Sequence, residues 1–357
     1  MDKKQLKQVL RNLKPALAIN SFVPMYQNYL FDEDKIVAYN TTMGIIYPLS
    51  EEGPFKGAVP GTLLYDFVSN CPAEDLTYKE LKNSVSIGAG KATIKLPLHP
   101  TDEFVFDAPD LENEGGIEID LDEHFVKGLE LSLLSVNENF FSASFCGVHL
   151  VYDSANTNTC LYASDNSVLS KYDCKGGSVI SEEGSYAEDL YLVLPYKFCT
   201  TVLSLLDQVG EGEAPYILIK DDSAIAGIGD YVVYTKLINK EDGLDFAQMF
   251  NDTTSNVKDV EPIPEGFTTA IEMASLISNK ISVSLDKNQM TFETGNAFGE
   301  YKESIDCDHN NKGSVWIEKA QVLNSISNTQ LMGLTSEYLY FENEDGNYQY
   351  IVSGLRD

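Results

Sequence analysis

The apolar positions of the chain fall into three successive segments that share one order of elements. In each segment an apolar stripe at helical spacing comes first, strand-like residues follow, a second helical stripe comes next, and hairpins close the segment. A recurrence of element type is typical of a chain built from similar domains. We predict three domains, covering residues 1–115, 116–255 and 256–357, each α+β with two helices packed on antiparallel sheet.

The first segment shows the order most clearly. Apolar residues every three or four positions from Leu6 to Leu13 form the first stripe, and Pro72 ends the second helix. Gly88-Ala89-Gly90 indicates the turn of a hairpin. The expected elements are helices at residues 3–14 and 61–69, and strands at 29–31, 35–39, 84–87 and 91–96.

In the second segment the helix starts are the main expectation. Asp120 is expected to cap the first helix, with Glu123 as its reciprocal partner. Pro195 is expected in the first turn of the second helix, a position that proline favours. The expected strands are residues 140–152, 216–219, 224–228 and 231–238.

The third segment repeats the order after an acidic, proline-containing stretch. Residues 107–116 and 251–266 are of this type, and both are expected to be exposed connectors. The expected elements are helices from near Glu265-Gly266 and at 318–327, and strands at 281–285, 289–293, 338–342 and 348–352.

Composition restricts what such a chain can do. Its 357 residues are 43% hydrophobic, as in globular proteins of several domains. With 25 Lys+Arg against 55 Asp+Glu, the net charge of −30 argues against a protein that holds nucleic acid by affinity, since phosphate contacts need clustered cations. No apolar run has membrane length, and no apolar stretch follows the basic start, so we expect a cytoplasmic protein without a membrane partner.

Candidate catalytic chemistry is sparse. The six cysteines form no Cys-x-x-Cys pair and are interpreted as reduced thiols. Gly88-Ala89-Gly90-Lys91 lacks the spacing of a phosphate-binding loop. The acids from Asp120 to Glu123 beside His124 are better explained as helix-capping residues than as metal ligands, so no metal or cofactor is expected. Cys307-Asp308-His309 leaves open a hydrolase with a cysteine nucleophile, although no motif supports it.

Short motifs then carry a resemblance to a known family. Residues 23–30 are similar to a Leu-Pro-Ile-Leu-x-Asn-x-Leu stretch, residues 145–150 to Leu-Asn-Gly-Val-x-Leu, and residues 193–197 to Ile-Pro-x-Lys. The last residues, 350–357, are similar to Tyr-Val-Val-Met-Pro-Met-Arg-Leu. In this order and spacing the chain resembles the bacterial-type DNA sliding clamp, the beta subunit of DNA polymerase III. A divergent member, of the kind that a phage or a mobile element encodes, fits the departures from these motifs.

The resemblance implies a fold and a function. Two subunits would close into a six-domain ring around duplex DNA, with the helices lining the hole. The ring would catalyse no reaction and would tether the replicative DNA polymerase, the clamp loader and other replication proteins. The alternative is a β-rich structural or scaffold protein of a virus that shares only the architecture.

The implied DNA-facing side chains are cations on the helices. Lys3, Lys7, Arg11 and Lys14 step at four, four and three residues, opposite the leucine stripe. A solvated surface of an ordinary helix is the competing interpretation. The remaining candidates are single cations, at Lys127, Lys197, Lys280 and Lys319. Such a thin lining suffices if the ring holds DNA by enclosure, without reading its sequence.

The second implied site is a groove for partner peptides beside the C-terminal strand. In the family it takes a short linear motif, and apolar walls would accept leucine or phenylalanine anchors. Changed residues at its rim predict a different preferred peptide. An ordinary last strand is the competing interpretation. The matching positions are Ser164, Asn166, Ser167, Val168, Leu169, Ile351, Val352, Ser353, Gly354 and Leu355.

Overall fold

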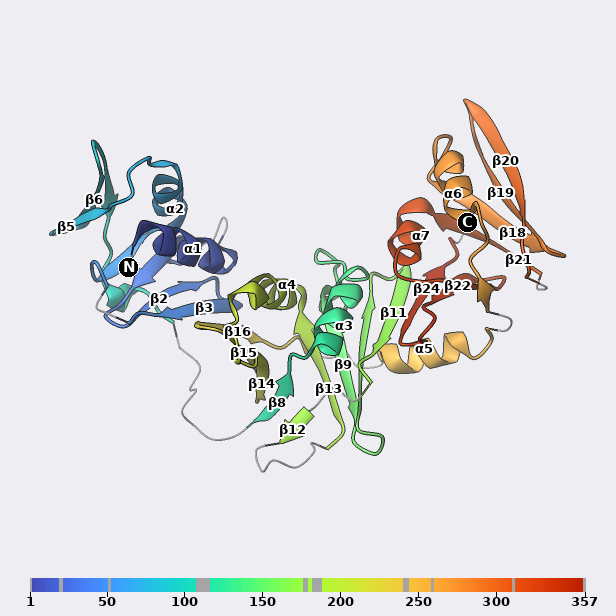
Figure 1. Ribbon diagram of the computed structural model, residues 1–357, viewed down its shortest axis with the longest axis horizontal. Helices are drawn as coiled ribbons and strands as arrows, with labels where there is room; N and C mark the ends of the chain where they lie inside the picture. The colour runs from blue at the N-terminus through green and yellow to red at the C-terminus, as the bar shows by residue number, and fades with distance from the viewer. Residues whose placement is uncertain are drawn as a thin grey trace. The chain divides into compact units, whose positions relative to one another are not determined.

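A computed structural model describes residues 2–18, 22–50, 53–106, 116–175, 179–181, 188–239, 244–257, 260–309 and 312–355 (Figure 1). The chain forms two compact units. Unit 1 comprises the described residues within Met1–Leu121, Ile180–Ser185 and Lys197–Leu237. Unit 2 comprises those within Asp122–Val179, Tyr186–Tyr196 and Ile238–Asp357.

Unit 1 is built on a nine-stranded sheet in the order β12-β8-β14-β15-β16-β3-β2-β1-β4. Antiparallel pairing of β16 with β3, in the register Val233 opposite Ile45, joins strands of the second predicted domain to strands of the first. A second sheet, β5-β6-β7, lies beside it. The strands are β1 (Asn28–Phe31), β2 (Lys35–Tyr39), β3 (Met43–Pro48), β4 (Gly57–Pro60), β5 (Thr77–Leu81), β6 (Ser84–Ala89), β7 (Ala92–Pro97), β8 (Ile117–Asp120), β12 (Val179–Ser181), β14 (Tyr216–Lys220), β15 (Ser223–Ile228) and β16 (Tyr231–Lys236).

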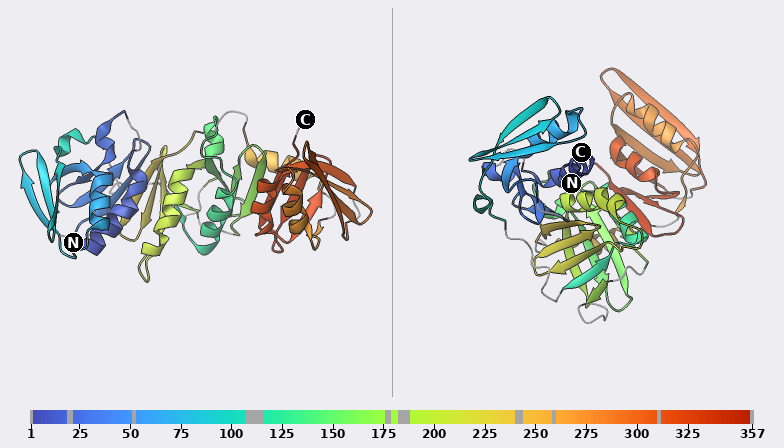
Figure 2. Two further views of the ribbon diagram at one scale, coloured as in Figure 1. Left: turned by 90° about the horizontal axis from the view of Figure 1, so that it is seen from above. Right: turned by 60° about the vertical axis from the view of Figure 1, so that its left-hand side comes forward.

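Helices α1 (Lys3–Leu13) and α2 (Gly61–Asn70) lie side by side against strands β1, β3 and β4 (Figure 2). The Asp2 carboxylate caps α1 by accepting the Gln5 N–H at 2.8 Å. The apolar stripe from Leu6 to Leu13 is buried, as its spacing predicts. The other helical segments of this unit are α4 (Tyr196–Leu205), whose first residue belongs to unit 2, and the short 3₁₀ turns η1 (Lys14–Ala16), η2 (Pro24–Gln27), η3 (Thr101–Glu103) and η5 (Leu206–Gln208).

Unit 2 is built on an eight-stranded sheet in the order β13-β9-β10-β11-β24-β23-β22-β17, with a smaller sheet, β20-β19-β18-β21. Here β11 pairs antiparallel with β24, which joins the second predicted domain to the third. The strands are β9 (Gly147–Asp153), β10 (Asn158–Ser164), β11 (Val168–Asp173), β13 (Leu190–Pro195), β17 (Glu261–Pro262), β18 (Lys280–Asp286), β19 (Gln289–Asn296), β20 (Gly299–Asp306), β21 (Gly313–Glu318), β22 (Leu331–Leu334), β23 (Tyr338–Glu342) and β24 (Tyr348–Ser353).

The helices of unit 2 cover these sheets. Helix α3 approaches β10 and β11 closely at Gly128, where a Cβ atom would lie 2.7 Å from the Tyr172 ring and 2.9 Å from Leu161. Helix α6 packs on β18, β19 and β20 and contacts α7. The helical segments are α3 (Glu123–Leu133), α5 (Phe246–Thr254), α6 (Phe267–Ser275), α7 (Lys319–Ile326) and the 3₁₀ turn η4 (Ala143–Cys146).

Two predicted helix starts are wrong. Asp120 is the last residue of β8, because the strand continues to the end of its pairing with β14; Asp122 caps α3 instead, accepting the Phe125 N–H at 2.7 Å. Pro195 ends β13 opposite Gly147, and α4 begins one residue later. A proline is tolerated there because β13 is an edge strand of its sheet.

Other elements depart from the predictions. The strand expected at 140–152 begins only at Gly147, after η4. Helix α5 was not predicted, and it extends to Thr254, inside the connector expected at 251–266. Twelve strands of the described residues were also missed, namely β3, β4, β5, β8, β10, β11, β12, β13, β17, β20, β21 and β22. Most of the connector expected at 107–116 lies outside the described residues.

The six cysteines are all free thiols, as predicted, and four of them are buried. No helix among the described residues is long and apolar enough to cross a membrane. Within the same residues, no group of three or more His, Cys, Asp or Glu side chains is placed to hold a metal ion.

Candidate functional site

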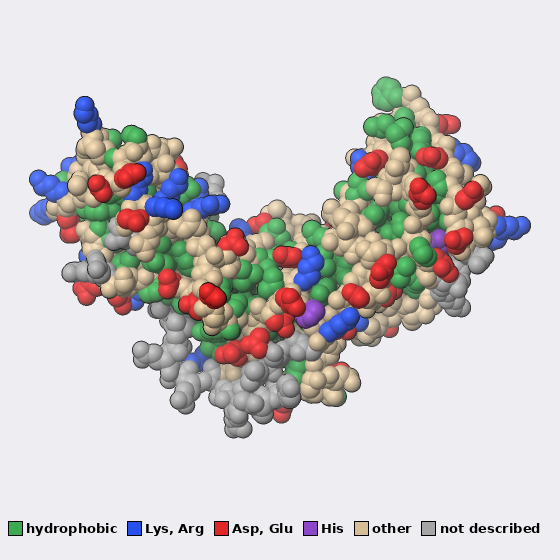
Figure 3. Space-filling model, in the orientation of Figure 1, with side chains coloured by type: hydrophobic (Ala, Val, Ile, Leu, Met, Phe, Trp, Pro, Cys, Tyr) green, Lys and Arg blue, Asp and Glu red, His purple; other side chains and the backbone are tan. Residues whose placement is uncertain are grey.

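The outer face of α1 is a row of cations without a carboxylate in the helix. Lys7, Arg11 and Lys14 are exposed, on the side opposite the buried leucines. Lys4 is exposed as well and was not among the predicted residues. Figure 3 shows basic side chains gathered over α1 and α2. The predicted row is therefore present as one continuous surface.

The two ends of the row also hold α2. The Lys3 ammonium donates a hydrogen bond to the Cys71 carbonyl, at the C-terminal end of α2, where the helix dipole favours a cation. The Lys14 ammonium lies 4.8 Å from the centre of the Tyr65 ring. No ion pair joins Lys7 or Arg11 to a carboxylate of the described chain. Lys7 and Arg11 are therefore available to an external anion such as a phosphate.

The four single cations form no second row. Lys127 on α3 pairs with Glu130 at 3.3 Å, and Lys197 is exposed in the first turn of α4. Lys280 was expected on a helix, but α6 ends at Ser275 and Lys280 is the first residue of β18, opposite Glu318. Lys319 begins α7 and is half-buried. The four candidates outside α1 are therefore single cations on separate elements, of which Lys127 is paired with a carboxylate and Lys319 is half-buried.

The groove positions lie on two neighbouring strands. Val168 is opposite Val352, and Leu169 is opposite Ile351, in the β11–β24 pair. The ladder continues past the strand end, where the Ser353 N–H donates to the Ser167 carbonyl at 2.8 Å. The structure thus brings together the two sequence segments that the family motifs pointed to.

Most of these side chains face inward. Val168 and Val352 are buried, and the buried Ser164 hydroxyl donates to the Val168 carbonyl at 2.6 Å, which fixes the β10–β11 turn. The Asp165 carboxylate accepts the N–H groups of Ser167 and Val168 in the same turn. Asn166 has a positive φ of 78° there. These residues shape the backbone of the site more than its surface.

Leu169 and Ile351 belong to a buried apolar cluster under α5. Its other members are aromatic, and we call it the α5 aromatic cluster. The Phe246 ring lies 5.2 Å from that of Phe145, and the Phe250 ring 6.1 Å from that of Tyr162. Its members are Phe145, Tyr162, Leu169, Phe246, Phe250, Tyr338, Tyr340 and Ile351. Helix α5, which the sequence did not predict, therefore packs over β10 and β11 at the positions expected for the groove. The signal that could have found α5 is Asp245, a capping residue followed by phenylalanines four positions apart.

The last three groove residues border a polar pocket of about 630 Å³, which we call the C-terminal pocket. The Gly354 N–H donates to the Glu337 carbonyl, and the Leu355 N–H to the Trp316 carbonyl, both at 2.7 Å. Trp316 is the one tryptophan of the chain and is 45% exposed. Asp252, from α5, and Glu337 supply carboxylates. This pocket suits a polar or basic group beside a flat ring.

The buried histidines do not form catalytic pairs. Both ring nitrogens of His149 are engaged at 2.7 Å, Nδ1 with the Tyr191 hydroxyl and Nε2 with the Ser144 carbonyl. Burial raises the pKa of the Cys307 thiol and lowers the pKa of the His309 imidazole. Both shifts favour neutral groups, whereas a cysteine nucleophile needs a thiolate. Neither ring nitrogen of His309 makes a hydrogen bond of normal geometry within the described residues, so the structure gives the hydrolase alternative no support.

Comparisons with known proteins agree with the resemblance. No protein-family model matches the chain. The beta sliding clamp of Helicobacter pylori is 22% identical over 289 residues, which cover 77% of this chain and 67% of that protein. A crystal structure of the H. pylori beta clamp bound to a DNA ligase peptide superposes with a TM-score of 0.81 and 18% identity, covering 100% of this chain and 99% of that one. The DNA polymerase III subunit beta of Pseudomonas aeruginosa gives 0.80 and 13%, with the same coverage.

These matches confirm the resemblance to bacterial sliding clamps. They also show that the described helices and antiparallel sheets form the beta-clamp fold over the whole length of the chain.

Proposed function

We propose that this chain is a DNA polymerase processivity factor, a sliding clamp that encircles duplex DNA and catalyses no reaction. The observation that carries the proposal is the continuous row of cations on α1, placed on a beta-clamp fold in a chain of net charge −30. Such a chain cannot hold DNA by many phosphate contacts. A ring that encloses DNA needs only a few weak contacts, which also let it slide.

Charge is distributed in a way that suits enclosure. Residues 1–106 carry 11 Lys+Arg and 12 Asp+Glu, whereas the whole chain carries 25 and 55. Nearly all of the excess acid therefore lies in the remaining residues. Acidic surfaces repel duplex DNA, and the region around α1 does not. We propose that Lys7 and Arg11 contact the phosphates and that Lys127, Lys197, Lys280 and Lys319 add little.

The proposed ring is a homodimer of three-domain subunits, with domains at 1–115, 116–255 and 256–357. Three of the exposed apolar side chains of unit 2 lie on α6, just after it and at the β19–β20 turn, and are of the kind that an interface covers. Met273 is 45%, Leu276 75% and Phe298 97% exposed. A second copy of the chain is the occupant we propose for them.

The proposed partners are a replicative DNA polymerase and a clamp loader, each bound through a short peptide. The relative from H. pylori has been crystallised with a DNA ligase peptide. Here we place the peptide along β11 and β24, between α5 and the C-terminal pocket. The exposed Ser353 and the half-buried Leu355 would contact it directly.

Retention on closed DNA tests the proposal. The protein should sediment as a dimer of about 79 kDa, twice the 39.5 kDa of the chain. Loaded by its cognate loader, it should stay on nicked circular DNA and leave the same DNA within seconds of linearisation. A stable monomer at micromolar concentration, or equal retention on both templates, would contradict it. A labelled C-terminal peptide of the polymerase should bind the wild type and lose about tenfold in affinity to Leu355→Asp.

A further inference from the structure

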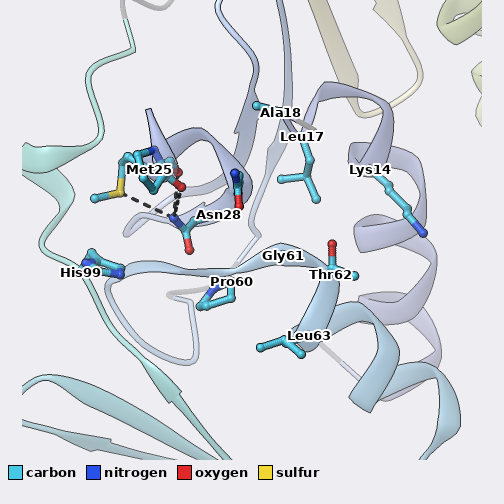
Figure 4. A pocket seen from close by; sticks show the side chains of 12 residues that line it. Lys14, Leu17, Ala18, Met25, Asn28, Pro60, Gly61, Thr62, Leu63 and His99 are labelled. Atoms are coloured by element: carbon cyan, nitrogen blue, oxygen red, sulfur yellow. Dashed lines mark hydrogen bonds between the residues drawn. The ribbon is translucent and has the colours of Figure 1, made fainter. Parts of the chain in front are cut away.

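Unit 1 contains a second pocket, of about 570 Å³, that the proposed function does not use. We call it the first-domain pocket. It lies where the end of α1 and η1, the turn η2 and the β4–α2 junction meet, and side chains from these segments surround a common space, with Lys14 and His99 at opposite edges of it (Figure 4). The described residues that line it lie between positions 14 and 99, within unit 1.

The walls are mainly apolar. Leu17 comes from the residue after η1, Met25 from η2, and Pro60 and Leu63 from the start of α2. Leu63 is a large apolar side chain that lines the pocket, yet 53% of it is exposed to solvent. Such a wall excludes a simple ion as occupant and favours an apolar side chain of about the size of leucine or phenylalanine.

The polar part of the rim favours negative charge. Among the described lining residues Lys14 carries a permanent charge; its exposed ammonium lies 4.8 Å from the centre of the Tyr65 ring, and no described carboxylate pairs with it. His99 lines the opposite side, with Glu103 at 3.9 Å. Gly61, Thr62 and Leu63 form the first turn of α2 and line the pocket. No side chain caps this helix by accepting a hydrogen bond from the N–H groups of that turn. A helix start and an ammonium group together attract a carboxylate.

DNA is a poor fit to this combination. A phosphate track needs several cations in a row, whereas here one lysine stands beside leucine, methionine and proline. A peptide satisfies both parts, because one residue can supply the apolar anchor and a neighbour the carboxylate. The nearly neutral charge of residues 1–106 also lets an acidic segment approach here, while the acid-rich remainder of the chain repels it.

We propose that the first-domain pocket docks a short segment of a partner protein in which an apolar side chain is followed within two residues by Asp or Glu. This is a second docking site, separate from the groove along β11 and β24. It does not require the ring to be closed. Its peptides are opposite in charge to those that the carboxylates of the C-terminal pocket would select.

A displayed library of random nine-residue peptides provides the first test. The full-length chain is the target, and Leu63→Glu is the counter-selecting variant, since it removes an apolar wall and adds a repelling charge. Leu63→Ser repeats the counter-selection without the charge, and urea denaturation checks that both variants remain folded. Recovered peptides should share the apolar–acidic pattern. A pool that binds both variants as well as the wild type, or a pool without acidic residues, would overturn the proposal.

A matched pair of charge reversals gives the second test. One recovered peptide, labelled with fluorescein, should bind Lys14→Glu about fivefold more weakly than the wild type, as expected for an exposed charge pair plus repulsion. Lys7→Glu makes the same change on the same helix outside the pocket and should bind normally. Equal losses in the two variants would refute the pocket as the site.

Two other occupants have distinct signatures. If Leu63→Glu sediments as a monomer while the wild type is a dimer, a second copy fills the pocket. If Leu63→Glu leaves circular DNA faster than the wild type does, the pocket faces DNA. Either result overturns the peptide proposal. The peptide-binding tests do not depend on whether the chain proves to be a clamp, because peptide binding is measured on the protein alone.

Discussion

The helix pair α1–α2 of unit 1 and the pair α6–α7 of unit 2 share an architecture but differ in surface charge. Both pairs pack side by side on antiparallel sheet through buried apolar stripes, with Leu10 in one and Ile271 in the other. The outer face of α1 carries cations and no acid, whereas α6 carries Glu272 and no cation. The buried apolar stripe of each helix pair therefore determines the fold, and the charge of the exposed face can differ between the pairs without changing it.

The two pockets differ in the same manner. The first-domain pocket has apolar walls and one lysine, while the C-terminal pocket has a tryptophan and two carboxylates. One repeated fold thus presents surfaces for partners of opposite charge. Three measurements test how far this division between stripe and surface holds.

The largest expected effect is on stability and should be the same in both pairs. Leu10→Ala and Ile271→Ala each remove a fully buried side chain and should lower the free energy of unfolding by about 2–5 kcal/mol. Lys7→Ala and Glu272→Ala, on the outer faces, should change it by less than about 0.5 kcal/mol. Urea denaturation measures all four. A surface variant as damaging as its buried neighbour would break the comparison.

The next effect is on DNA and should occur in one pair only. The double variant Lys7→Gln/Arg11→Gln should lower the slope of log affinity against log salt concentration by up to about 2, because each phosphate contact contributes about 0.9. The variant Glu272→Gln/Lys319→Gln on α6 and α7 is the matched control and should leave the slope nearly unchanged. Fluorescence anisotropy with duplex DNA over a salt series gives both slopes. Equal slopes in the wild type and both double variants would show that the two helix pairs do not differ in DNA binding.

The smallest expected effect is a difference between the units in how their stability depends on pH. Burial lowers the pKa of His309 in unit 2, whereas His99 in unit 1 is partly exposed. The unfolded chain therefore binds a proton that the folded chain does not, as the pH falls below the ordinary histidine pKa of about 6.5. Unit 2 should lose stability between pH 7 and 5, and His309→Gln should flatten that decline. Denaturation curves at several pH values test this, and an unchanged slope in the variant would contradict it.

Apolar periodicity predicted the elements that have a strong one-sided stripe. The bounds of β2 and β23 agree with the expected residues 35–39 and 338–342. Strand β20 was missed because its exposure alternates between exposed and half-buried, so it has no apolar face to recognise. Helix α5 was missed because its stripe consists of only two buried phenylalanines, Phe246 and Phe250.

The sites divide along similar lines. The cations of α1 could be predicted because the spacing within one helix decides which side chains share a face. The pairing of β11 with β24 depends on segments far apart in the chain, and only the family resemblance indicated that Leu169 and Ile351 would meet. Nothing local in the sequence joins Lys14 to Leu63, so the first-domain pocket required the structure.

The β11–β24 pair also sets an order of events during synthesis. Strand β11 ends at Asp173, and its partner begins at Tyr348, about 175 residues later. At roughly 5–20 residues per second, the ribosome needs about 9–35 seconds to make that stretch. During this time the edge of β11 has no partner from β24, and an unpaired edge can join another chain. Unit 1 has a similar delay, since β3 ends at Pro48 and its partner β16 begins only at Tyr231. The nascent chain is thus open to misassembly, and in need of a chaperone, from the synthesis of its first domain until its third domain is complete.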